Sequence, residues 1–308
     1  EPDFIHVHDF VPLLAVSSRQ NLRAGVRVVW DAHELYHHQQ GNSWGMRITR
    51  SLVLRHYLSR IDMVFTVSEG VRSQYEADFP KFPPCTVIAN ASSVSVMPRR
   101  SRRLRKQLGL EKGQRILLFQ GGLGAGRGIG LLLSLVPLLN PEWVVVFMGT
   151  GSFALEIEQA ASAYPKRVFL ISPVSPDELA EITSGADLGA IPYENTNLNH
   201  RNAAPNKIWE YSVAGVPILA RNLPQLASFV ESNQMGILFS DSDSPSQVAL
   251  KVNALSGKEL ARMGERAKVF ASEDNWQKYE TRMWKAYNLL AARRHSSEEG
   301  EQDCVSLQ

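Results

Sequence analysis

Short apolar segments alternate with helix-length segments along most of this chain, and this alternation is the feature that most restricts its fold. Between residues 116 and 239 the expected strands are Ile116–Gln120, Val144–Met148, Val168–Ile171, Leu188–Ile191, Ile218–Ala220 and Gly236–Phe239. Strands that are separated by helices pair in parallel, and the helices cover the two faces of the sheet. We therefore predict a doubly wound α/β unit in this part of the chain.

The same alternation occupies the N-terminal third. We expect strands at Phe4–His8, Val26–Trp30, Met63–Val67 and Thr86–Ala89, with helices at Val11–Leu22, Met46–Ser59 and Glu69–Phe79. The basic segment Met97–Lys106 interrupts the alternation and is the best candidate for a linker. The predicted organisation is two Rossmann-like domains, residues 1–97 and 98–275, with a ligand cleft between them.

The C-terminal segment carries apolar and aromatic residues at helical spacing. They are Trp276, Tyr279, Met283, Trp284, Tyr287 and Leu290. This spacing predicts one long helix with a single apolar stripe over residues 276–294. Residues 295–308 are polar, and we expect them to be disordered.

Composition excludes several classes of function. The 308 residues are 44% hydrophobic and 21% charged, with a net charge of +2, which argues against nucleic acid as a main partner. The two cysteines, Cys85 and Cys304, lack metal-ligand spacing and favour a reducing compartment. Without a signal peptide or an apolar run of membrane-spanning length, the expected location is cytoplasmic. Because Glu1 leads directly into a strand without an initiator Met, we expect an incomplete first domain.

The segment Ala204–Leu219 combines a helix and a strand with an unusual charge pattern. Pro205 opens the expected helix and Gly215 closes it. Lys207 lies in the first turn, where the helix macrodipole disfavours a cation, and Glu210 follows in the poorer order for an intrahelical pair. An anion such as phosphate would explain the lysine. A solvated charge pair is the alternative.

A glycine-rich segment, Gln120–Gly130, follows one predicted strand and precedes a helix. Its glycines allow close backbone approach to a ligand, and Arg127 adds a positive charge. We favour a phosphate cradle over a flexible loop without a ligand. Gly149-x-Gly151-x-x-Ala154 fits a loose dinucleotide pattern, but the next strand ends at Ser172 instead of an acidic residue, so a nicotinamide cofactor is disfavoured.

Three further patterns have simpler explanations. His33-Glu34-Leu35-Tyr36-His37 matches the zinc-protease letters but follows a strand and lacks a third ligand. Asp241-Ser242-Asp243 resembles a metal-binding D-x-D, yet an acidic helix cap before Pro245 is simpler. The basic run Arg99–Lys106 and four arginines of a predicted helix could contact anionic lipid, although solvated surface is the commoner explanation. These arginines are Arg47, Arg50, Arg55 and Arg60.

With these segments placed in order, the chain resembles the retaining GT-B glycosyltransferases of family 4, from Pro2 to about Leu290. The motifs that carry the resemblance are His6-Val7-His8-Asp9, Val29–Tyr36, Thr66-Val67-Ser68-Glu69, Val87–Ala91, the diphosphate loop Phe119–Gly128, the donor-binding helix Pro205–Pro217 and the crossover helix Trp276–Arg294. The resemblance implies a GT-B fold, with an N-terminal acceptor-side domain that lacks its upstream strands, and a C-terminal nucleotide-sugar domain. It also implies that the long C-terminal helix packs back on the first domain.

The resemblance assigns roles to individual residues. It implies that His8, Arg127 and Lys207 are catalytic, with His8 beside the reacting sugar carbon and the two cations at the donor diphosphate. Glu210 would hold the nucleotide ribose. The other implied donor-binding residues are Gly121, Gly122, Gly149, Gly151, Ser172, Val174, Asn202 and Asn206, and the acceptor-side residues are His8, Asp9, His33 and Glu34. No metal ligands and no cofactor are expected.

Two positions depart from the family pattern. Asn202 stands where the family often has a Glu, and Gly122 where a second Arg is common. The implied activity is transfer of a sugar from a nucleotide-diphosphate donor to a glycan, lipid or small-molecule acceptor, as in polysaccharide biosynthesis, with the inner membrane face as an alternative location. A related epimerase or phosphorylase, or a non-catalytic module that binds nucleotide sugars, remains an open alternative.

Overall fold

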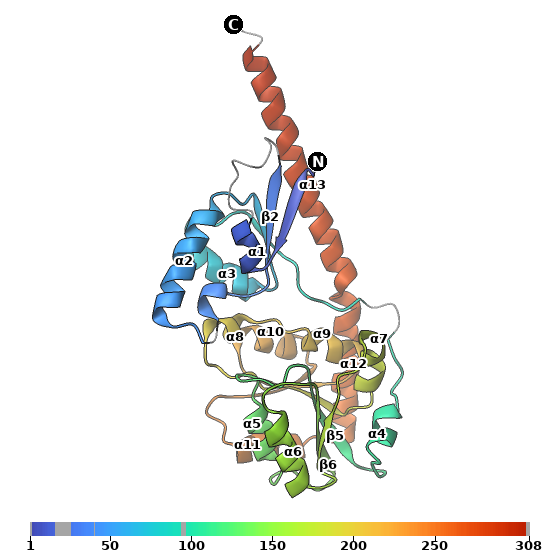
Figure 1. The fold of residues 1–308 in the computed structure, drawn as a ribbon. Helices are drawn as coiled ribbons and strands as arrows, with labels where there is room; N and C mark the ends of the chain where they lie inside the picture. The colour runs from blue at the N-terminus through green and yellow to red at the C-terminus, as the bar shows by residue number, and fades with distance from the viewer. Residues whose placement is uncertain (1, 16–25, 40, 94–96, 306–308) are drawn as a thin grey trace. The chain divides into compact units, whose positions relative to one another are not determined.

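The computed structural model describes residues 2–15, 26–39, 41–93 and 97–305, which form two compact units (Figure 1). The first unit comprises Glu1–Asn90, Asn197–Ala203 and Trp276–Gln308, and the second comprises Ala91–Thr196 and Ala204–Asn275. The sequence pattern did not indicate that Asn197–Ala203 belongs with the first unit. This segment contains α8 (Leu198–Asn202), and Asn199 Oδ1 accepts a hydrogen bond of 2.8 Å from the backbone N–H of Leu35.

The first unit is built on a parallel sheet in the order β1-β2-β3-β4. Its strands are β1 (Phe4–His8), β2 (Arg27–Ala32), β3 (Met63–Thr66) and β4 (Cys85–Val87). Its helices in the N-terminal part are α1 (Phe10–Ala15), the short 3₁₀ helix η2 (Tyr36–His38), α2 (Trp44–Leu58) and α3 (Glu69–Asp78). The part of the predicted helix Val11–Leu22 beyond residue 15 lies outside the described residues. Trp30, Leu54 and Tyr75 are fully buried in the core of this unit.

The long C-terminal helix α13 (Trp276–Val305) belongs to the first unit. Tyr287 packs its ring edge-on against Phe4 at 5.2 Å and Phe65 at 5.7 Å, which fixes the helix to the open sheet face. The sequence predicted disorder from His295, but the helix continues to Val305. This stretch contains no proline, and its several glutamates and Gln302 favour helix.

The second unit has a six-stranded parallel sheet in the order β10-β9-β8-β5-β6-β7. Its strands are β5 (Arg115–Gln120), β6 (Trp143–Met148), β7 (Val168–Ile171), β8 (Leu188–Ile191), β9 (Ile218–Arg221) and β10 (Gly236–Phe239). Its helices are α4 (Arg103–Gln107), α5 (Ile129–Leu135), α6 (Ala154–Ala163), α7 (Pro176–Thr183), α9 (Lys207–Val213), α10 (Pro224–Ser232), α11 (Pro245–Asn253) and α12 (Gly257–Glu273). The chain builds β5, β6 and β7 toward one edge and then β8, β9 and β10 toward the other.

The helix ends of the second unit follow local side-chain chemistry. Ser244 and Ser256 cap α11 and α12, each in a reciprocal capping box with the residue three positions later. The prediction of an acidic cap for α11 is therefore wrong. Asp243 instead pairs with Lys251 at 2.5 Å, and its carboxylate accepts a hydrogen bond from the Ser240 N–H.

Two other local predictions need correction. The segment taken as a linker contains helix α4, where Leu104 is fully buried and anchors the turn. Helix α9 begins at Lys207, later than Pro205, and is only seven residues long. Its end agrees with the sequence, because Gly215 adopts the left-handed conformation with φ of 68° just past the helix.

Glycine 264 provides a test of packing in the second unit. A Cβ atom at this position would lie 2.4 Å from the carbonyl oxygen of Gly215. We expect Gly264→Ala to lower the free energy of unfolding by about 1–3 kcal/mol, because overpacking outweighs the better helix propensity of alanine. Gly257→Ala is the matched control, since nothing lies within 4 Å of its added Cβ in the same helix. Urea unfolding followed by tryptophan fluorescence measures both, and equal stability of the two variants would contradict this packing argument.

Candidate active site

The centre of the second sheet is the point where the strand order reverses. Strand β5 lies between β8 and β6, so the connections after β5 and β8 leave toward opposite edges. Ligands of open α/β sheets bind outside the carboxyl ends of the strands at such a point. The two loops are locked together there: the backbone N–H of Glu194 donates to the Gly126 carbonyl at 2.9 Å, and a Cβ on Gly128 would lie 2.1 Å from the Pro192 carbonyl oxygen.

Lys207 brings a buried ammonium group to this point. Its side chain is 8% exposed, and Nζ donates to the Tyr193 hydroxyl at 3.2 Å. Nζ also lies 5.2 Å from the centre of the Phe119 ring and 5.4 Å from that of Tyr193. A Cβ atom on Gly121 would be 2.9 Å from Nζ, so the ammonium group lies directly against the glycine-rich loop.

Arg127 adds a second cation on the same aromatic side chain. Its guanidinium carbon is 4.5 Å from the centre of the Tyr193 ring. Across the described parts of the chain, neither Arg127 nor Lys207 forms an ion pair with a carboxylate. Keeping a buried ammonium group without a counter-charge is unfavourable. The arrangement therefore favours binding of an anion at the strand ends.

A pocket of about 320 Å³ lies at the same strand ends. It is lined by residues at or just after the ends of β5, β6 and β7 and by two helical residues: Gln120, Gly121, Gly122, Met148, Gly149, Thr150, Pro173, Val174, Leu179 and Glu210. The loops can approach closely because Gly149 has no Cβ. A Cβ at this position would lie 1.9 Å from the Gly121 carbonyl oxygen.

Glu210 is held in this pocket by a chain of hydrogen bonds. Gln120 Nε2 donates to Glu210 Oε2 at 2.6 Å, and Thr183 Oγ1 donates to Gln120 Oε1 at 2.8 Å. These bonds fix the carboxylate at the edge of the pocket, where its lone pairs can accept from hydroxyl groups of a ligand.

Several predicted donor-binding residues lie elsewhere. Gly151 allows its loop to pack against the Leu123 backbone, because an added Cβ would lie 2.3 Å from the Leu123 carbonyl oxygen. Ser172 and Asn206 are exposed and do not line the pocket. Asn202 belongs to the first unit, and its amide donates to the Leu198 carbonyl at 3.0 Å. The roles of these four residues remain predictions.

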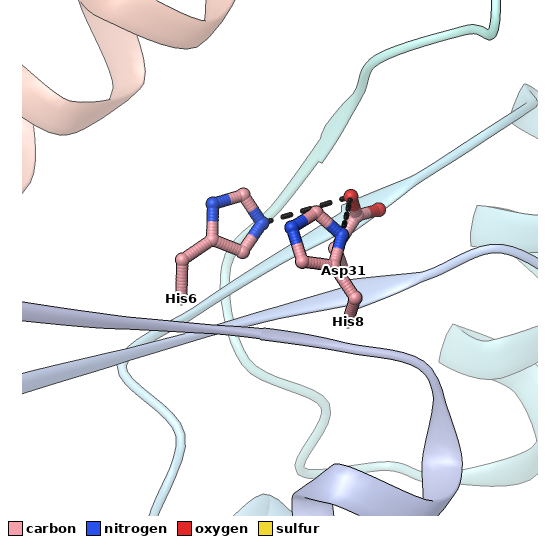
Figure 2. Close-up of side chains that lie close together, drawn as sticks. All are labelled: His6, His8 and Asp31. Atoms are coloured by element: carbon pink, nitrogen blue, oxygen red, sulfur yellow. Dashed lines mark ion pairs between the residues drawn. The ribbon is translucent and has the colours of Figure 1, made fainter.

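In the first unit, the strand-end histidines surround one carboxylate. His8 Nδ1 lies 3.1 Å from Asp31 Oδ2, and His33 Nε2 lies 3.2 Å from the same oxygen. His6 and His8, both on β1, stack with ring centres 4.4 Å apart and point toward Asp31 of β2 (Figure 2). His6, His8 and Asp31 each offer an atom that could ligate a metal ion, as do His37, His38 and Asp78.

The carboxylate and imidazoles of this cluster perturb one another. Burial raises the pKa of Asp31, but the interactions with the His33 and His6 rings outweigh it and hold that pKa well below its usual range. The hydrogen bond to Asp31 raises the pKa of His33, against the opposing effect of burial. A hydrogen-bonded imidazole of this kind can carry a proton near neutral pH.

The two other predicted acceptor-side residues are engaged in hydrogen bonds. Asp9 adopts a left-handed backbone conformation with φ of 66°, and its carboxylate accepts a hydrogen bond of 2.5 Å from the Tyr36 hydroxyl. Glu34 accepts hydrogen bonds from Gln39 at 2.5 Å and from Asn199 at 2.7 Å. These contacts make Asp9 and Glu34 parts of the framework around the histidine cluster.

The zinc-protease letters do not form one site. His33 contacts Asp31, whereas His37 Nε2 lies 2.7 Å from Asp78 Oδ2. Both histidines lie in a loop and a single 3₁₀ turn instead of on one face of an α-helix. The structure thus agrees with treating this match as coincidence.

Sequence reasoning missed several residues of these sites. Tyr193 contacts both cations, Gln120 and Thr183 fix Glu210, and Asp31 joins the strand-end histidines. Their positions at or just after strand ends were the available signal for all but Thr183, which lies at the end of α7. Tyr193 follows Pro192 immediately after β8, a place where side chains of a doubly wound sheet reach the ligand.

The fold is that of the GT-B class, in which each unit holds a parallel α/β sheet. The sucrose-phosphate synthase of Thermosynechococcus elongatus superposes with a TM-score of 0.77 at 19% identity, over 94% of this chain and 74% of that one. Anabaena Alr3699/HepE, solved in complex with UDP and glucose, superposes with a TM-score of 0.76 at 16% identity, over 93% and 78%. At these identities the likeness establishes the fold alone.

Family membership rests on sequence. Residues 100–270 match the family model of Glycosyl transferases group 1, and residues 1–95 match that of Glycosyltransferase Family 4. The chain therefore belongs to the glycosyl transferases of group 1. Spore coat protein SA of Bacillus subtilis (strain 168) is 23% identical over 257 residues, which are 76% of this chain. The chain spans 65% of the length of that relative.

The His33–Asp31 pair predicts a pH-dependent contribution to stability. The raised pKa of His33 gives stabilisation that is complete below about 6.5 and is lost as the pH rises through the folded-state pKa. The lowered pKa of Asp31 gives stabilisation above about 3.9 that is lost only as the pH falls through its folded-state pKa. In EDTA-treated protein, Asp31→Asn should therefore lower the free energy of unfolding more at about pH 5.5 than at about pH 8.5.

Urea unfolding at the two pH values measures this difference, and NMR titration of the His33 ring should show its pKa falling in the variant. An equal loss of stability at both pH values would contradict the coupling between the two side chains.

Proposed function

We propose that this protein is a retaining glycosyltransferase of the hexosyltransferase type, which transfers a sugar from a nucleotide-diphosphate donor. The single observation that carries the proposal is the pair of cations, Lys207 and Arg127, which share the Tyr193 ring at the switch point and have no ion-pair partner there among the described residues. A diphosphate supplies the anionic charge that this arrangement lacks. Family membership is consistent with that ligand.

The chemistry follows from where charge develops. Cleavage of the sugar–phosphate bond places negative charge on the leaving diphosphate. Fixed positive groups that are already oriented toward that charge stabilise the transition state without reorganisation. We propose that Lys207 and Arg127 do this in place of a metal ion, with backbone N–H groups of the glycine-rich loop as further donors. Because α9 has only seven residues, we give its N-terminus a smaller role than the sequence suggested.

The donor base and ribose belong to the same pocket in this proposal. Glu210 would accept hydrogen bonds from the ribose hydroxyls, and the loops after β6 and β7 would flank the base. Anabaena Alr3699/HepE and Staphylococcus aureus TarM were both solved with UDP, which makes UDP-sugars the first donors to test. A thermal-shift panel of UDP-, GDP- and ADP-sugars would identify the nucleotide, since a ligand that binds only the folded state raises its melting temperature.

The acceptor side is proposed to include His8, with Asp9, His33 and Glu34 around it. His8 has a 61% exposed side chain at the end of β1, so its imidazole is available to a substrate. We propose that the acceptor attacks from the face that the donor phosphate leaves, with that phosphate accepting the acceptor proton. The acceptor class is a glycan, a lipid or a small molecule.

Replacement of the buried lysine tests the diphosphate assignment. We expect Lys207→Met to lower turnover with a nucleotide-sugar donor at least about 10-fold, because charge on the leaving group loses a fixed counter-charge. Arg127→Ala should have an effect of the same direction and size. Methionine keeps the packing between Phe119 and Tyr193, which limits the loss of folding stability. The measurement is steady-state transfer or donor hydrolysis, together with donor affinity by calorimetry.

Lys258→Met is the matched control, because Lys258 is exposed on α12 of the same unit. It should leave turnover and donor affinity unchanged. A Lys207→Met protein that retained both turnover and donor affinity would remove the basis of the proposal.

Three alternatives would use the same anion-binding site at Lys207 and Arg127. An epimerase would convert the donor sugar without an acceptor, and a phosphorylase would consume inorganic phosphate. Product analysis with donor alone and with phosphate distinguishes them. A binding module would show donor binding by calorimetry without transfer or hydrolysis.

A lipid surface is the second partner that we propose, and an exposed stripe on α2 favours it. Trp44, Ile48 and Leu52 recur every four residues and are 79%, 39% and 61% exposed. Arg55 extends the same face, and a pocket of about 310 Å³ beside it is lined by Arg55, Leu58, Ser59, Phe79, Pro80 and Lys81. Apolar side chains flanked by cations are typical of helices that lie on anionic membranes. Among the described residues, no helix has the length and apolarity needed to cross a bilayer.

The structure reduces the set of arginines that could contact anionic lipid. Arg50 donates to the Tyr36 carbonyl at 2.7 Å, so it supports the fold. In the basic run, Arg100 and Arg105 pair with Asp187, and Arg103 pairs with Glu178. The predicted lipid contact of that run is therefore disfavoured, and α2 is the better surface.

Vesicle binding tests the α2 stripe. We expect Leu52→Glu to reduce sedimentation with anionic phosphatidylglycerol vesicles, because it removes apolar area and adds a repelled charge. Leu250→Glu is the control, as Leu250 is 67% exposed in the second unit. Binding should weaken with added salt. Equal binding by the two variants would exclude α2 as the contact surface.

A further inference from the structure

Four metal-ligating side chains lie on one face of the first sheet. His6 and His8 are two residues apart on β1, as are Asp31 and His33 at the end of β2, and side chains two residues apart point to the same face. The parallel register places His8 beside Asp31. An H-x-H pattern and a D-x-H pattern on neighbouring strands therefore meet at their carboxyl ends.

The ligand atoms of His6, His8 and Asp31 all lie within 4.8 Å of one another, and His33 lies beside two of them. Asp31 Oδ2 lies 3.1 Å from His8 Nδ1, 3.2 Å from His33 Nε2 and 3.6 Å from His6 Nε2. His8 Nδ1 and His33 Nε2 are 3.5 Å apart. Ligands that bind tetrahedral Zn²⁺ at about 2.0–2.2 Å are separated from one another by about 3.3–3.6 Å. The separations of Asp31 Oδ2 from His8 Nδ1 and His6 Nε2, 3.1 and 3.6 Å, lie at or close to this range.

Hydrogen bonding within the cluster leaves one buried ring nitrogen without a hydrogen-bond partner among the described residues and crowds one carboxylate oxygen. Three ring nitrogens face the single oxygen Asp31 Oδ2, which cannot accept three well-directed hydrogen bonds on one side. His6 Nε2 is buried and makes no hydrogen bond to any described residue. A cation at the centre of the cluster would satisfy that nitrogen and the crowded oxygen together.

A further contact orients His6. The Tyr287 hydroxyl of α13 lies 2.8 Å from His6 Nδ1. A histidine that ligates a metal through one nitrogen usually donates a hydrogen bond through the other, which fixes the ring orientation and its tautomer. In a metal site the His6 Nδ1–H would donate to the Tyr287 hydroxyl, and Nε2 would face Asp31.

We propose that His6 Nε2, His8 Nδ1 and Asp31 Oδ2 bind one Zn²⁺ or a similar divalent transition-metal ion, with His33 beside the open fourth position. Imidazole ligands suit Zn²⁺, Co²⁺, Ni²⁺ and Cu²⁺, whereas Mg²⁺ prefers an octahedral set of oxygens. The site departs from the sequence-based expectation that the chain binds no metal. The site shares His8 and His33 with the proposed acceptor side, but it does not rest on the proposed transferase function, because metal binding is tested without donor or acceptor.

The second histidine cluster of the same unit is a natural comparison. The Arg47 guanidinium donates to His38 Nδ1 at 3.0 Å, so Nε2 of that ring carries the hydrogen that it donates to Asp78 at 3.1 Å. The ring nitrogens of His38 are therefore both occupied, and the nearby guanidinium disfavours a cation. We expect no transition-metal binding at His37, His38 and Asp78.

The test is titration of EDTA-treated protein with ZnCl₂ by calorimetry, with MgCl₂ for comparison. We expect one Zn²⁺ per chain and no comparable binding of Mg²⁺. His8→Ala should weaken Zn²⁺ binding at least about 10-fold, because it removes a ligand whose exposed side chain contributes little to folding. Tyr287→Phe should weaken binding by about 10- to 100-fold through loss of the orienting hydrogen bond. Co²⁺ loading should give the visible absorption of a four-coordinate ion.

Asp78→Asn is the matched control, since it removes the carboxylate of the other cluster and should leave Zn²⁺ affinity unchanged. Asp31→Asn provides a second ligand variant, and its circular dichroism spectrum checks that it is folded. The proposal is overturned if Zn²⁺ does not bind, if Asp78→Asn weakens binding while His8→Ala does not, or if Co²⁺ gives only an octahedral spectrum. These readouts require no sugar donor, so their failure is separate from failure of the transferase assignment.

Discussion

Parallel pairing of the strands is the constraint on which both candidate sites depend. All described strand pairs in the two sheets are parallel. Each strand must then be followed by a crossover, and the carboxyl ends of neighbouring strands meet at the same edge. Residues far apart in sequence, such as Gly121 after β5 and Tyr193 after β8, are brought together for that reason. The topology of the sheets therefore determines where ligand-binding side chains can gather.

Lys207 shows how this constraint is combined with burial. Phe119 and Tyr193 exclude water from its ammonium group, which strengthens any electrostatic interaction that it makes. The backbone of Gly121 can approach this group because glycine has no Cβ, which would lie 2.9 Å from Nζ. A charge that is costly to bury becomes useful when its partner is a substrate that arrives charged.

The fold was largely predictable because strand and helix periods are local. Phe4–His8, Val168–Ile171, Leu188–Ile191 and Gly236–Phe239 match the observed strands in full. The errors arose where tertiary contacts decide the structure. Burial of Leu104 turns part of the expected linker into α4. Hydrogen bonds from the Leu35 N–H to Asn199 and from the Ser68 hydroxyl to the Asn202 carbonyl attach α8 to the first unit.

The candidate sites were predictable only in part. Lys207, Glu210 and Arg127 stand out as charges at strand and helix ends, where a one-dimensional pattern can identify them. Tyr193, Gln120 and Asp31 each have a partner, Lys207, Glu210 and His8 respectively, that lies 14 to 90 positions away, so only the folded chain reveals these contacts. Asn202 was assigned from its spacing to Glu210, but spacing along the chain does not fix which unit a residue joins.

The two sites show opposite imbalances of charge and hydrogen bonding. At the second sheet, two cations share an aromatic ring and have no ion-pair partner among the described residues, so an anion is the missing component. At the first sheet, three imidazoles compete for one carboxylate oxygen, so a cation is the missing component. Buried polar groups in native proteins are nearly always satisfied, and the exceptions point to ligands. Each imbalance therefore specifies the charge of its ligand independently of the other.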